Sequence, residues 1–309
     1  MRVPCTEWPM TKVSLKLETE SVSLRYLEID AWATSDALAA MLEGQMSAVA
    51  AVRAAMPALA AGVDAAAARI GTSGRLIYAG AGTSGRIAVQ DGAELPPTFN
   101  WPSERLIFAM AGGSKALTRS VEGAEDDTAA AERRITDANV GNHDIVIGVA
   151  ASGTTPFTIA TIEKARALGA LTIGIANNPG APLLTAAEYP ILIATGPEVI
   201  AGSTRMKAGT AQKIVLNLFS TCLMIKLGRV YQGRMVDMAA RNAKLDRRAR
   251  IMVADLAGCD ATTAAAALTE SGGELKLAIL LASGYPLAKA RNLLARHAGN
   301  LRLALKEAR

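Results

Sequence analysis

The chain has 309 residues, half of them hydrophobic and only 4% aromatic, and a formal net charge of +5. This length can bury one large core and a smaller second unit, whereas the low aromatic content and modest charge argue against a nucleic-acid-binding protein. The three cysteines and two histidines have no metal-ligand or disulfide-framework spacing, so we predict no metal site and a reducing, cytoplasmic compartment.

A helical segment is predicted before any strand begins. Residues 1–20 carry charges and no sustained apolar run, so no signal peptide is expected. Residues 34–70 are rich in Ala, Met, Leu and Val, which predicts a pair of packed helices with Pro57 near their junction. The most apolar helical stretch, residues 214–225, is bounded by lysines and is judged too short to span a bilayer. No membrane association is therefore predicted.

Short β-branched runs then alternate with segments of helical length, which predicts an α/β fold with a doubly wound parallel sheet and helices on both faces. The predicted strands are residues 75–78, 105–108, 144–149, 171–175 and 191–193.

Two longer helices, over residues 206–227 and 238–256, follow the predicted strands, and Gly228 ends the first. A basic cluster over residues 241–250 is interpreted as a solvated helix face. Residues 259–309 are predicted to form three short helices separated by glycine-containing breaks. The predicted division is an extension (1–33), a main domain with its helical preface (34–257) and a small carboxyl-terminal helical unit (258–309).

Two loops of small residues each follow a predicted strand and open a predicted helix: residues 79–86 (AGAGTSGR) and 150–156 (AASGTTP). Such loops gather backbone N–H groups, hydroxyls and helix N-termini around one anion. Residues 80–85 also match a dinucleotide fingerprint, but the next strand is followed by glycines and no acidic residue for ribose. A monophosphate is favoured, and tight turns without a ligand are the other interpretation. The candidate phosphate-binding residues are Gly82, Thr83, Ser84, Gly85, Arg86, Ser152, Gly153, Thr154 and Thr155.

Two carboxylates are expected to project toward the crevice at the strand ends. Glu94 precedes a rigid Pro-Pro turn after the first loop, and Glu125 follows the second strand. Carboxyl groups in different environments can act as acid and base, although solvated surface glutamates or helix caps are the simpler alternative.

A third segment, residues 196–210, joins the last strand to the long helix and combines a carboxylate, hydroxyls and cations. This mixture suits sugar hydroxyls and phosphate, while an ordinary N-cap by Ser203 or Thr204 is about equally supported. Its candidate ligand residues are Glu198, Ser203, Arg205 and Lys207.

Four motifs in this order resemble the N-acetylmuramic acid 6-phosphate etherase family of sugar isomerase (SIS) proteins. They are residues 74–86, 94–98 (ELPPT), 121–126 (VEGAED) and 196–213. The similarity covers nearly the whole chain.

The resemblance implies a SIS fold, a cytoplasmic homodimer and a lyase without cofactor or metal. The family cleaves the lactyl ether of its phosphorylated amino sugar, giving N-acetylglucosamine 6-phosphate and D-lactate in cell-wall recycling. It implies that Glu94 is the general acid, Glu125 is the base, and Ser84, Ser152 and Thr155 hold phosphate. Ring opening acidifies the C2 proton, so Glu125 can remove it while Glu94 protonates the lactyl oxygen and then guides water to C3.

The sequence departs from the family pattern in places. Thr154 stands where many members have Arg, Ser23 replaces a common Asn, and Gly44-Gln45 replaces a frequent Glu-Asp pair. The first is expected to loosen substrate affinity, and the others to alter the helical preface or the dimer. Residues 1–16 have no clear counterpart, which indicates a disordered extension or a start-site artefact.

Two rival functions share the fold. A sugar phosphate isomerase would return the C2 proton to C1 and expel nothing. A non-catalytic sugar-phosphate-binding regulator similar to glucokinase regulatory protein would need neither acid nor base. The presence of both Glu94 and Glu125 favours the etherase.

Overall fold

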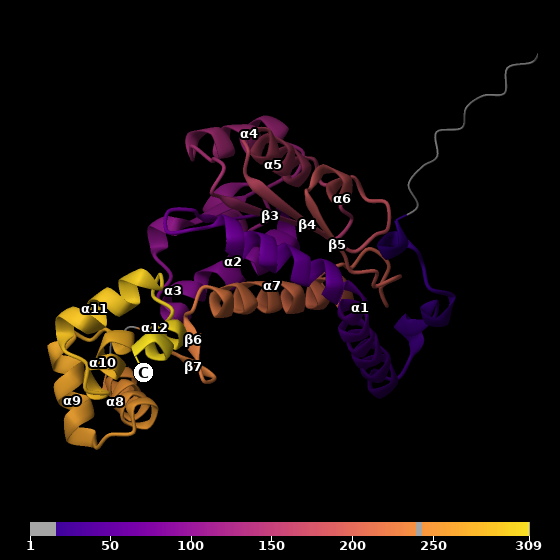
Figure 1. Ribbon diagram of the computed structural model, residues 1–309. Coiled ribbons are helices and arrows are strands. Elements are labelled where there is room, and N and C mark those ends of the chain that lie inside the picture. Colours follow the sequence, from indigo (N-terminus) through magenta and orange to yellow (C-terminus); the bar gives the residue numbers. More distant parts are fainter. Residues whose placement is uncertain (1–16, 239–242, 309) are drawn as a thin grey trace, which may run out of the picture.

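The computed structural model describes residues 17–238 and 243–308, and its centre is a five-stranded parallel sheet (Figure 1). Each predicted strand is present, so the predicted doubly wound α/β fold is confirmed. Three central strands are buried along their whole length, as β-branched runs between two helical layers should be. In spatial order the strands are β2 (Leu106–Met110), β1 (Leu76–Gly80), β3 (Ile145–Ala150), β4 (Leu171–Ala176) and β5 (Tyr189–Leu192).

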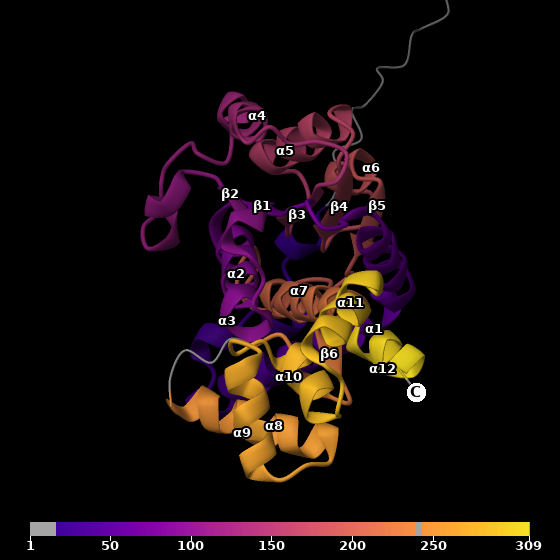
Figure 2. The ribbon, with the colours of Figure 1, turned by 60° about the vertical axis from the view of Figure 1, so that its left-hand side comes forward.

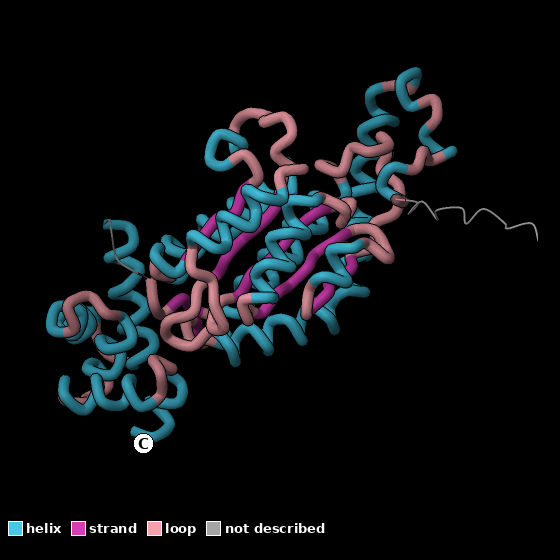
Figure 3. Tube along the Cα trace, turned by 90° about the horizontal axis from the view of Figure 1, so that it is seen from above, coloured by secondary structure: helices cyan, strands magenta, loops and turns pink. Residues whose placement is uncertain are grey.

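Helices cover both faces of the sheet (Figures 1 and 3). Leu76 and Tyr78 of β1 pack with one helical layer, whereas Ile77 and Ala79 pack with the other, following the two-residue period of a strand. The first layer contains α1 (Thr34–Arg69), α2 (Gly82–Ala93) and α7 (Lys207–Lys226), and the second contains α4 (Thr128–Asp137), α5 (Pro156–Ala167) and α6 (Pro182–Ala186).

Helix α1 corrects one prediction, because residues 34–69 form one continuous helix with Pro57 inside it. Proline in a helix interior removes one hydrogen bond and costs about 3 kcal/mol. Here Pro57 lies on the solvent side with the exposed Arg53 one turn earlier, so water can satisfy the freed carbonyl. Val52 and Leu59 are buried on either side of the proline, so packing holds the helix together across it.

Two helices, α1 and α7, are long and apolar enough to cross a membrane by length and composition, and α8 (Ala243–Ala257) with α9 (Ala261–Glu270) passes the same test as a bent pair. The expectation that the α7 region is too short is therefore wrong, since the helix extends to 20 residues. Val215, Phe219 and Leu223 of α7 pack in the core with strand residues.

The carboxyl-terminal part forms a separate helical bundle at one end of the molecule (Figure 2). It follows a short hairpin of β6 (Val230–Tyr231) and β7 (Arg234–Met235). Four helices, not the predicted three, lie after residue 258 in the described part, because three glycine-containing breaks separate four segments. Beyond α9 these are α10 (Leu275–Ala282), α11 (Leu287–Arg296) and α12 (Leu301–Ala308).

The hydrophobic cluster of this bundle also contains α8, which was assigned to the main domain. We therefore propose that the domain boundary lies before α8, near the hairpin, and not between residues 257 and 258. The described basic residues of α8 are exposed, in agreement with a solvated helix face. Residues 1–16 and the start of the helix predicted from 238, residues 239–242 with Arg241, lie outside the described residues.

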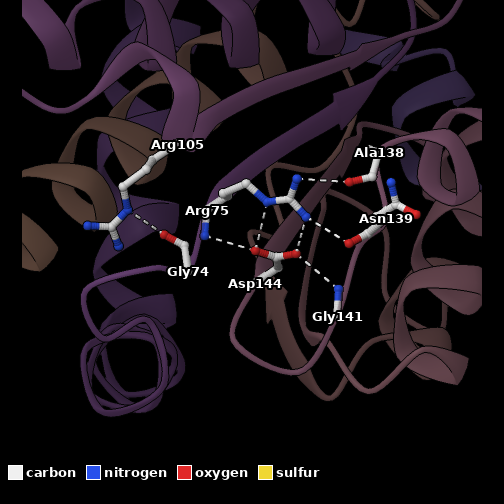
Figure 4. Close-up of polar contacts among 7 residues, drawn as sticks. All are labelled: Gly74, Arg75, Arg105, Ala138, Asn139, Gly141 and Asp144. Atoms are coloured by element: carbon white, nitrogen blue, oxygen red, sulfur yellow. Dashed lines mark hydrogen bonds and ion pairs between the residues drawn. The ribbon is translucent and has the colours of Figure 1, made fainter.

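Arg75 and Asp144 join β1 to β3 at the edge where the strands begin (Figure 4). Asp144 Oδ1 accepts hydrogen bonds from the Arg75 backbone N–H at 2.9 Å and from Nε at 3.1 Å, and Oδ2 accepts from Nη2 at 2.6 Å. The guanidinium also donates to the carbonyls of Ala138 and Asn139, just after α4. The network fixes β1 against β3. It thereby helps to set the relative position of the two loops that follow these strands at their carboxyl ends.

Candidate functional site

The two predicted phosphate loops lie side by side, because they follow neighbouring strands. Gly80 at the end of β1 is in register with Val149 in β3. From this point the connection after β1 enters α2 on one face, while the connection after β3 enters α5 on the other. Ligands of open α/β sheets bind outside such a switch point, at the carboxyl ends of the strands. The topology therefore favours this crevice as the ligand site.

The first loop brings the start of α2 unusually close to β1. A Cβ on Gly85 would lie 2.7 Å from the carbonyl oxygen of Gly80 and 2.4 Å from Met110 Sδ, so only glycine permits this packing. Gly82 has φ +51° and begins the helix, and Ser84 is buried in its first turn. No side chain in the described part of the chain caps α2, so its first N–H groups are free to bind an anion.

The second loop is organised by its hydroxyl groups. Ser152 Oγ accepts hydrogen bonds from the Thr154 backbone N–H at 3.1 Å and from Thr154 Oγ1 at 3.0 Å. Gly153 has φ +67°, and a Cβ there would meet Ala181 at 2.4 Å. Thr155 is the N-cap residue of α5, without a side-chain cap bond. The loop thus presents three partly exposed hydroxyls next to the first loop.

The N-termini of the two other long helices at this edge already have partners within the protein. The Phe157 N–H, in the first turn of α5, donates to the Glu125 carbonyl at 2.9 Å. Glu198 is buried, and its carboxylate accepts from the N–H groups of Lys207 at 3.0 Å and Ala208 at 2.8 Å at the start of α7. Among these three helices, α2 is therefore the best placed for a phosphate.

Glu125 lines a cavity of about 340 Å³ beside the first loop. Its side chain is exposed, and Gly82 and Arg86 line the same cavity. Arg86 Nε donates to the carbonyl of Ala116 at 2.9 Å, so this guanidinium holds the loop after β2 against α2. In Figure 3 this loop, which contains the 3-10 helix η5 (Gly113–Leu117), protrudes from the sheet.

Glu94 is not brought to this cavity within one chain. It is exposed at the end of α2, between that helix and the short α3 (Leu95–Phe99). Since α2 begins at the carboxyl edge of the sheet, Glu94 lies twelve residues after Gly82, about 18 Å farther along the helix axis. The two candidate catalytic carboxylates are thus at opposite ends of α2.

The third predicted segment lies at the same edge as the two loops, but its residues have different surroundings. Glu198 caps α7, whereas the alternative interpretation of the sequence was a cap by Ser203 or Thr204. Lys207 Nζ donates to the Pro197 carbonyl at 2.5 Å, and burial lowers the pKa of its ammonium group. Arg205 is exposed, and Ser203 is half-buried. These two side chains are the ones that remain available for a sugar.

An amino-terminal residue, Thr19, also belongs to this edge of the sheet. Thr19 is fully buried, and its N–H donates to Asn178 Oδ1 at 3.2 Å, while Asn178 Nδ2 donates to Thr19 Oγ1 at 3.0 Å and to the Ala151 carbonyl at 2.9 Å. The Thr19 carbonyl accepts from the Gly202 N–H at 3.0 Å. Polar Asn178, just after β4, could have been noticed, but no local pattern marks Thr19 as a contact between the second loop and the third segment.

Two sequence departures lie beside the third segment. A Cβ on Gly44 of α1 would be 3.3 Å from Val199, and Gln45 Oε1 accepts a hydrogen bond from Thr210 Oγ1 in α7. They therefore affect how α1 packs against this segment. Within residues 17–238 and 243–308, no group of three His, Cys, Asp or Glu side chains could hold a metal ion.

Two family models match parts of the chain. The family described as "SIS domain" matches residues 126–221, and "Glucokinase regulatory protein N-terminal SIS domain" matches residues 58–166. Among solved structures, a phosphoheptose isomerase from Francisella tularensis has 17% sequence identity and a TM-score of 0.48, covering 63% of this chain and 100% of that chain.

Several curated relatives carry the name N-acetylmuramic acid 6-phosphate etherase. The protein of Deinococcus radiodurans is 52% identical over 263 residues, covering 85% of this chain and 86% of the relative. That of Erwinia tasmaniensis is 46% identical, with 91% and 92% covered, and that of Streptomyces coelicolor is 45% identical, with 94% of each covered.

Proposed function

The chain belongs to the N-acetylmuramic acid 6-phosphate etherase family, and from this premise we propose that it cleaves the D-lactyl ether of N-acetylmuramic acid 6-phosphate. The products are N-acetylglucosamine 6-phosphate and D-lactate, and the role is the recycling of cell-wall amino sugars. The observation that carries the proposal is 52% identity across most of the chain to a relative with this name. The uncapped start of α2 beside a hydroxyl-rich loop supports a phosphorylated ligand.

The reaction is an elimination followed by addition of water, which makes the enzyme a carbon–oxygen lyase. In the open-chain sugar the C1 aldehyde acidifies the C2 proton, and C3 carries the ether. Glu125 removes the C2 proton, and the lactyl oxygen leaves from C3 with a proton from Glu94. Water then adds to C3, and the proton returns to C2. Positioned carboxyl groups can perform each proton transfer.

In the proposed binding mode, the phosphate lies between the first turn of α2 and the hydroxyls of Ser152, Thr154 and Thr155. The amides of Thr83 and Ser84 point along α2 toward the anion, and the positive end of the helix dipole adds to the attraction. The sugar then extends toward the cavity lined by Glu125. Ser203 and Arg205 contact its hydroxyl groups from the other side.

We also propose that the active site is completed by a second copy of the chain. Carboxyl pairs that act on one glycosidic bond lie roughly 5–9.5 Å apart. Within one chain, Glu94 lies about 18 Å along α2 from the loop beside Glu125. A homodimer in which each chain supplies Glu94 to its partner's cavity provides the acid and the base at one ether bond.

An apolar stripe on α1 supports this homodimer. Leu38, Leu42, Met46 and Val49 are each more than half exposed, and their spacing puts them on one face of the helix. Neighbouring exposed apolar side chains on a helix face are typical of an interface between chains. The enzyme is proposed to work in the cytoplasm, where this phosphorylated sugar and the reduced cysteines are both expected.

The test is D-lactate release from N-acetylmuramic acid 6-phosphate in heavy water. Wild-type protein should release lactate and give a sugar product with deuterium at C2, and Glu125→Gln should abolish both. Glu163→Gln, an exposed glutamate on α5, is the matched control and should leave the rate unchanged. A folded protein that binds the sugar phosphate without releasing lactate would be a regulator, and ketose formation would identify an isomerase.

A further inference from the structure

The residues around Glu94 are held from two directions, although Glu94 itself is exposed. On the α2 side, Asp91 accepts hydrogen bonds from Tyr78 Oη at 2.9 Å, Asn217 Nδ2 at 2.5 Å and Ser220 Oγ at 3.1 Å. These contacts fix the end of α2 against β1 and α7. After Glu94, Leu95 and Phe99 of α3 are buried in the core cluster that includes β1, and side-chain hydrogen bonds to this segment lie at its far end.

Arg229 holds the far end of α3. Its Nη1 donates to the carbonyl of Phe99 at 2.8 Å and to that of Asn100 at 3.1 Å, where α3 ends. Asn100 has φ +51° and cannot continue the helix. The guanidinium also lies 5.1 Å from the ring centre of Trp101, which is 2% exposed and is covered on its ring by Arg105 at 4.3 Å. Two cations and one buried ring thus fix the chain directly after α3.

The same Arg229 is connected to the carboxyl-terminal bundle. Asp237 Oδ2 lies 3.8 Å from Arg229 Nη1 and 2.6 Å from Lys276 Nζ on α10. Lys276 is largely buried, and burial lowers the pKa of its ammonium group. Asn100 and Lys276 also line one cavity of about 670 Å³ between α3 and the bundle. A continuous path of charged contacts therefore runs from α10 to the end of α3.

The bundle also contacts the main domain directly, next to Arg229. A Cβ on Gly228, after α7, would lie 3.1 Å from Cα of Asn300, so the turn before α12 touches the end of α7. In Figures 1 and 2 the bundle lies beside α3 and the end of α7 and away from the phosphate loops of the same chain. A direct contact between the bundle and those loops cannot be its role within one chain.

We propose that the carboxyl-terminal bundle positions Glu94 through Lys276, Asp237 and Arg229, which makes these three positioning residues for protonation of the leaving group. The inference rests on the proposed function. α3 has only five residues and two prolines, so it transmits a shift at Phe99 to Glu94 as a stiff unit. A misplacement of about 1 Å can lower a rate about 100-fold.

The test compares two leaving groups that differ in their need for an acid. The lactyl oxygen would leave C3 as an alkoxide and therefore needs a proton from an acid. Chloride, leaving C3 of a 3-chloro-3-deoxy analogue of the substrate, is a stable anion and needs none. Lys276→Met and Arg229→Lys are each expected to lower lactate release at least about tenfold while chloride release stays within about twofold. The ratio of the two rates does not depend on the fraction of folded protein, so partial unfolding cannot produce this result.

Two reference variants make the outcome decisive. Glu94→Gln should lower the same ratio more strongly, and if it leaves the ratio unchanged the proposed acid role itself is wrong. Lys289→Met removes an exposed cation from α11 of the same bundle and should change neither rate. If Glu94→Gln lowers the ratio but Lys276→Met and Arg229→Lys leave it at the wild-type value, the positioning role is overturned.

Discussion

At the scale of single residues, Glu94, Glu125 and Glu198 differ in role because they differ in what they contact. Glu198 has both carboxylate oxygens on backbone N–H groups of α7, whereas Glu94 and Glu125 are exposed. The sequence places all three near helix starts or ends, and only their contacts separate a cap from a free carboxylate. Glu198 is therefore expected to contribute to stability more than to proton transfer.

Replacing Glu198 with Gln should destabilise the protein by about 1–2 kcal/mol, because an amide can accept only one of the two hydrogen bonds and carries no charge at the helix N-terminus. Urea unfolding measures the difference. Glu163→Gln, which removes an exposed carboxylate from α5, should change the free energy of unfolding by less than about 0.5 kcal/mol. Equal effects of the two substitutions would show that Glu198 is not a structural cap.

The Asp144 carboxyl predicts a pH dependence of stability. Burial raises its pKa, but hydrogen bonds from the Arg75 side chain and from the backbone of Gly141 and Arg75 outweigh burial, so the pKa lies below its ordinary 3.8. The folded state then binds fewer protons than the unfolded chain. The stability that Asp144 provides is present above about pH 3.8 and is lost as the pH falls through the folded pKa.

Asp144→Asn should lower the free energy of unfolding by about 2–3 kcal/mol at neutral pH, since it leaves the partly buried Arg75 without its counter-charge. The difference from wild type should shrink when urea unfolding is repeated at about pH 3. Asp255 forms an exposed ion pair with Arg234, so Asp255→Asn should change the free energy of unfolding only slightly at both pH values. An Asp144→Asn deficit that is the same at both pH values would contradict the argument.

At the scale of elements, the strands and the two phosphate loops could be predicted because their signals are local. β-branched runs, glycines and hydroxyls within ten residues of each other define them. The single helix α1 could not be predicted, because what holds it together across Pro57 is its packing in the core with other elements. The same holds for the contact of Thr19 with Asn178, which joins residues 159 positions apart.

Gly85 is the element-scale residue that can be tested most directly. Ala at this position would press against the Gly80 carbonyl and Met110, so α2 would have to move away from β1, at a cost of about 2–3 kcal/mol. Gly82→Ala is the control, because a Cβ there meets nothing and only its φ of +51° is unfavourable, by about 1 kcal/mol. The midpoint temperature of thermal unfolding should therefore be much lower for Gly85→Ala than for Gly82→Ala. The reverse order would contradict the close packing.

At the scale of the whole molecule, the direction of α2 decides how the site is built. The sequence suggested that Glu94 and Glu125 face one crevice, because both follow strands. A helix of twelve residues separates Glu94 from that edge, so the structure brings only Glu125 to it within one chain. In a parallel sheet the helix after a strand runs back toward the opposite edge, so the twelve residues between Gly82 and Glu94 were the signal that separates Glu94 from Glu125.

Mixing two inactive variants tests the shared site. If Glu94 acts in the partner's cavity, a dimer of one Glu94→Gln chain and one Glu125→Gln chain has one site with both wild-type glutamates and one with neither. Random exchange makes half of the dimers mixed, so about a quarter of wild-type lactate release should return. If both glutamates of a site come from one chain, every site in the mixture lacks one of them and no activity returns.

The α1 stripe connects this experiment to assembly. Leu42→Glu puts a charge in the middle of the exposed apolar face and should shift the protein toward a monomer in size-exclusion chromatography, with loss of lactate release at low protein concentration. Glu43→Gln, next to it on the same helix but paired with the exposed Arg25, should remain dimeric and active. Because a monomer keeps Glu125 and the phosphate loops, it should still bind inorganic phosphate. A Leu42→Glu monomer with full lactate release would mean that one chain contains a complete site.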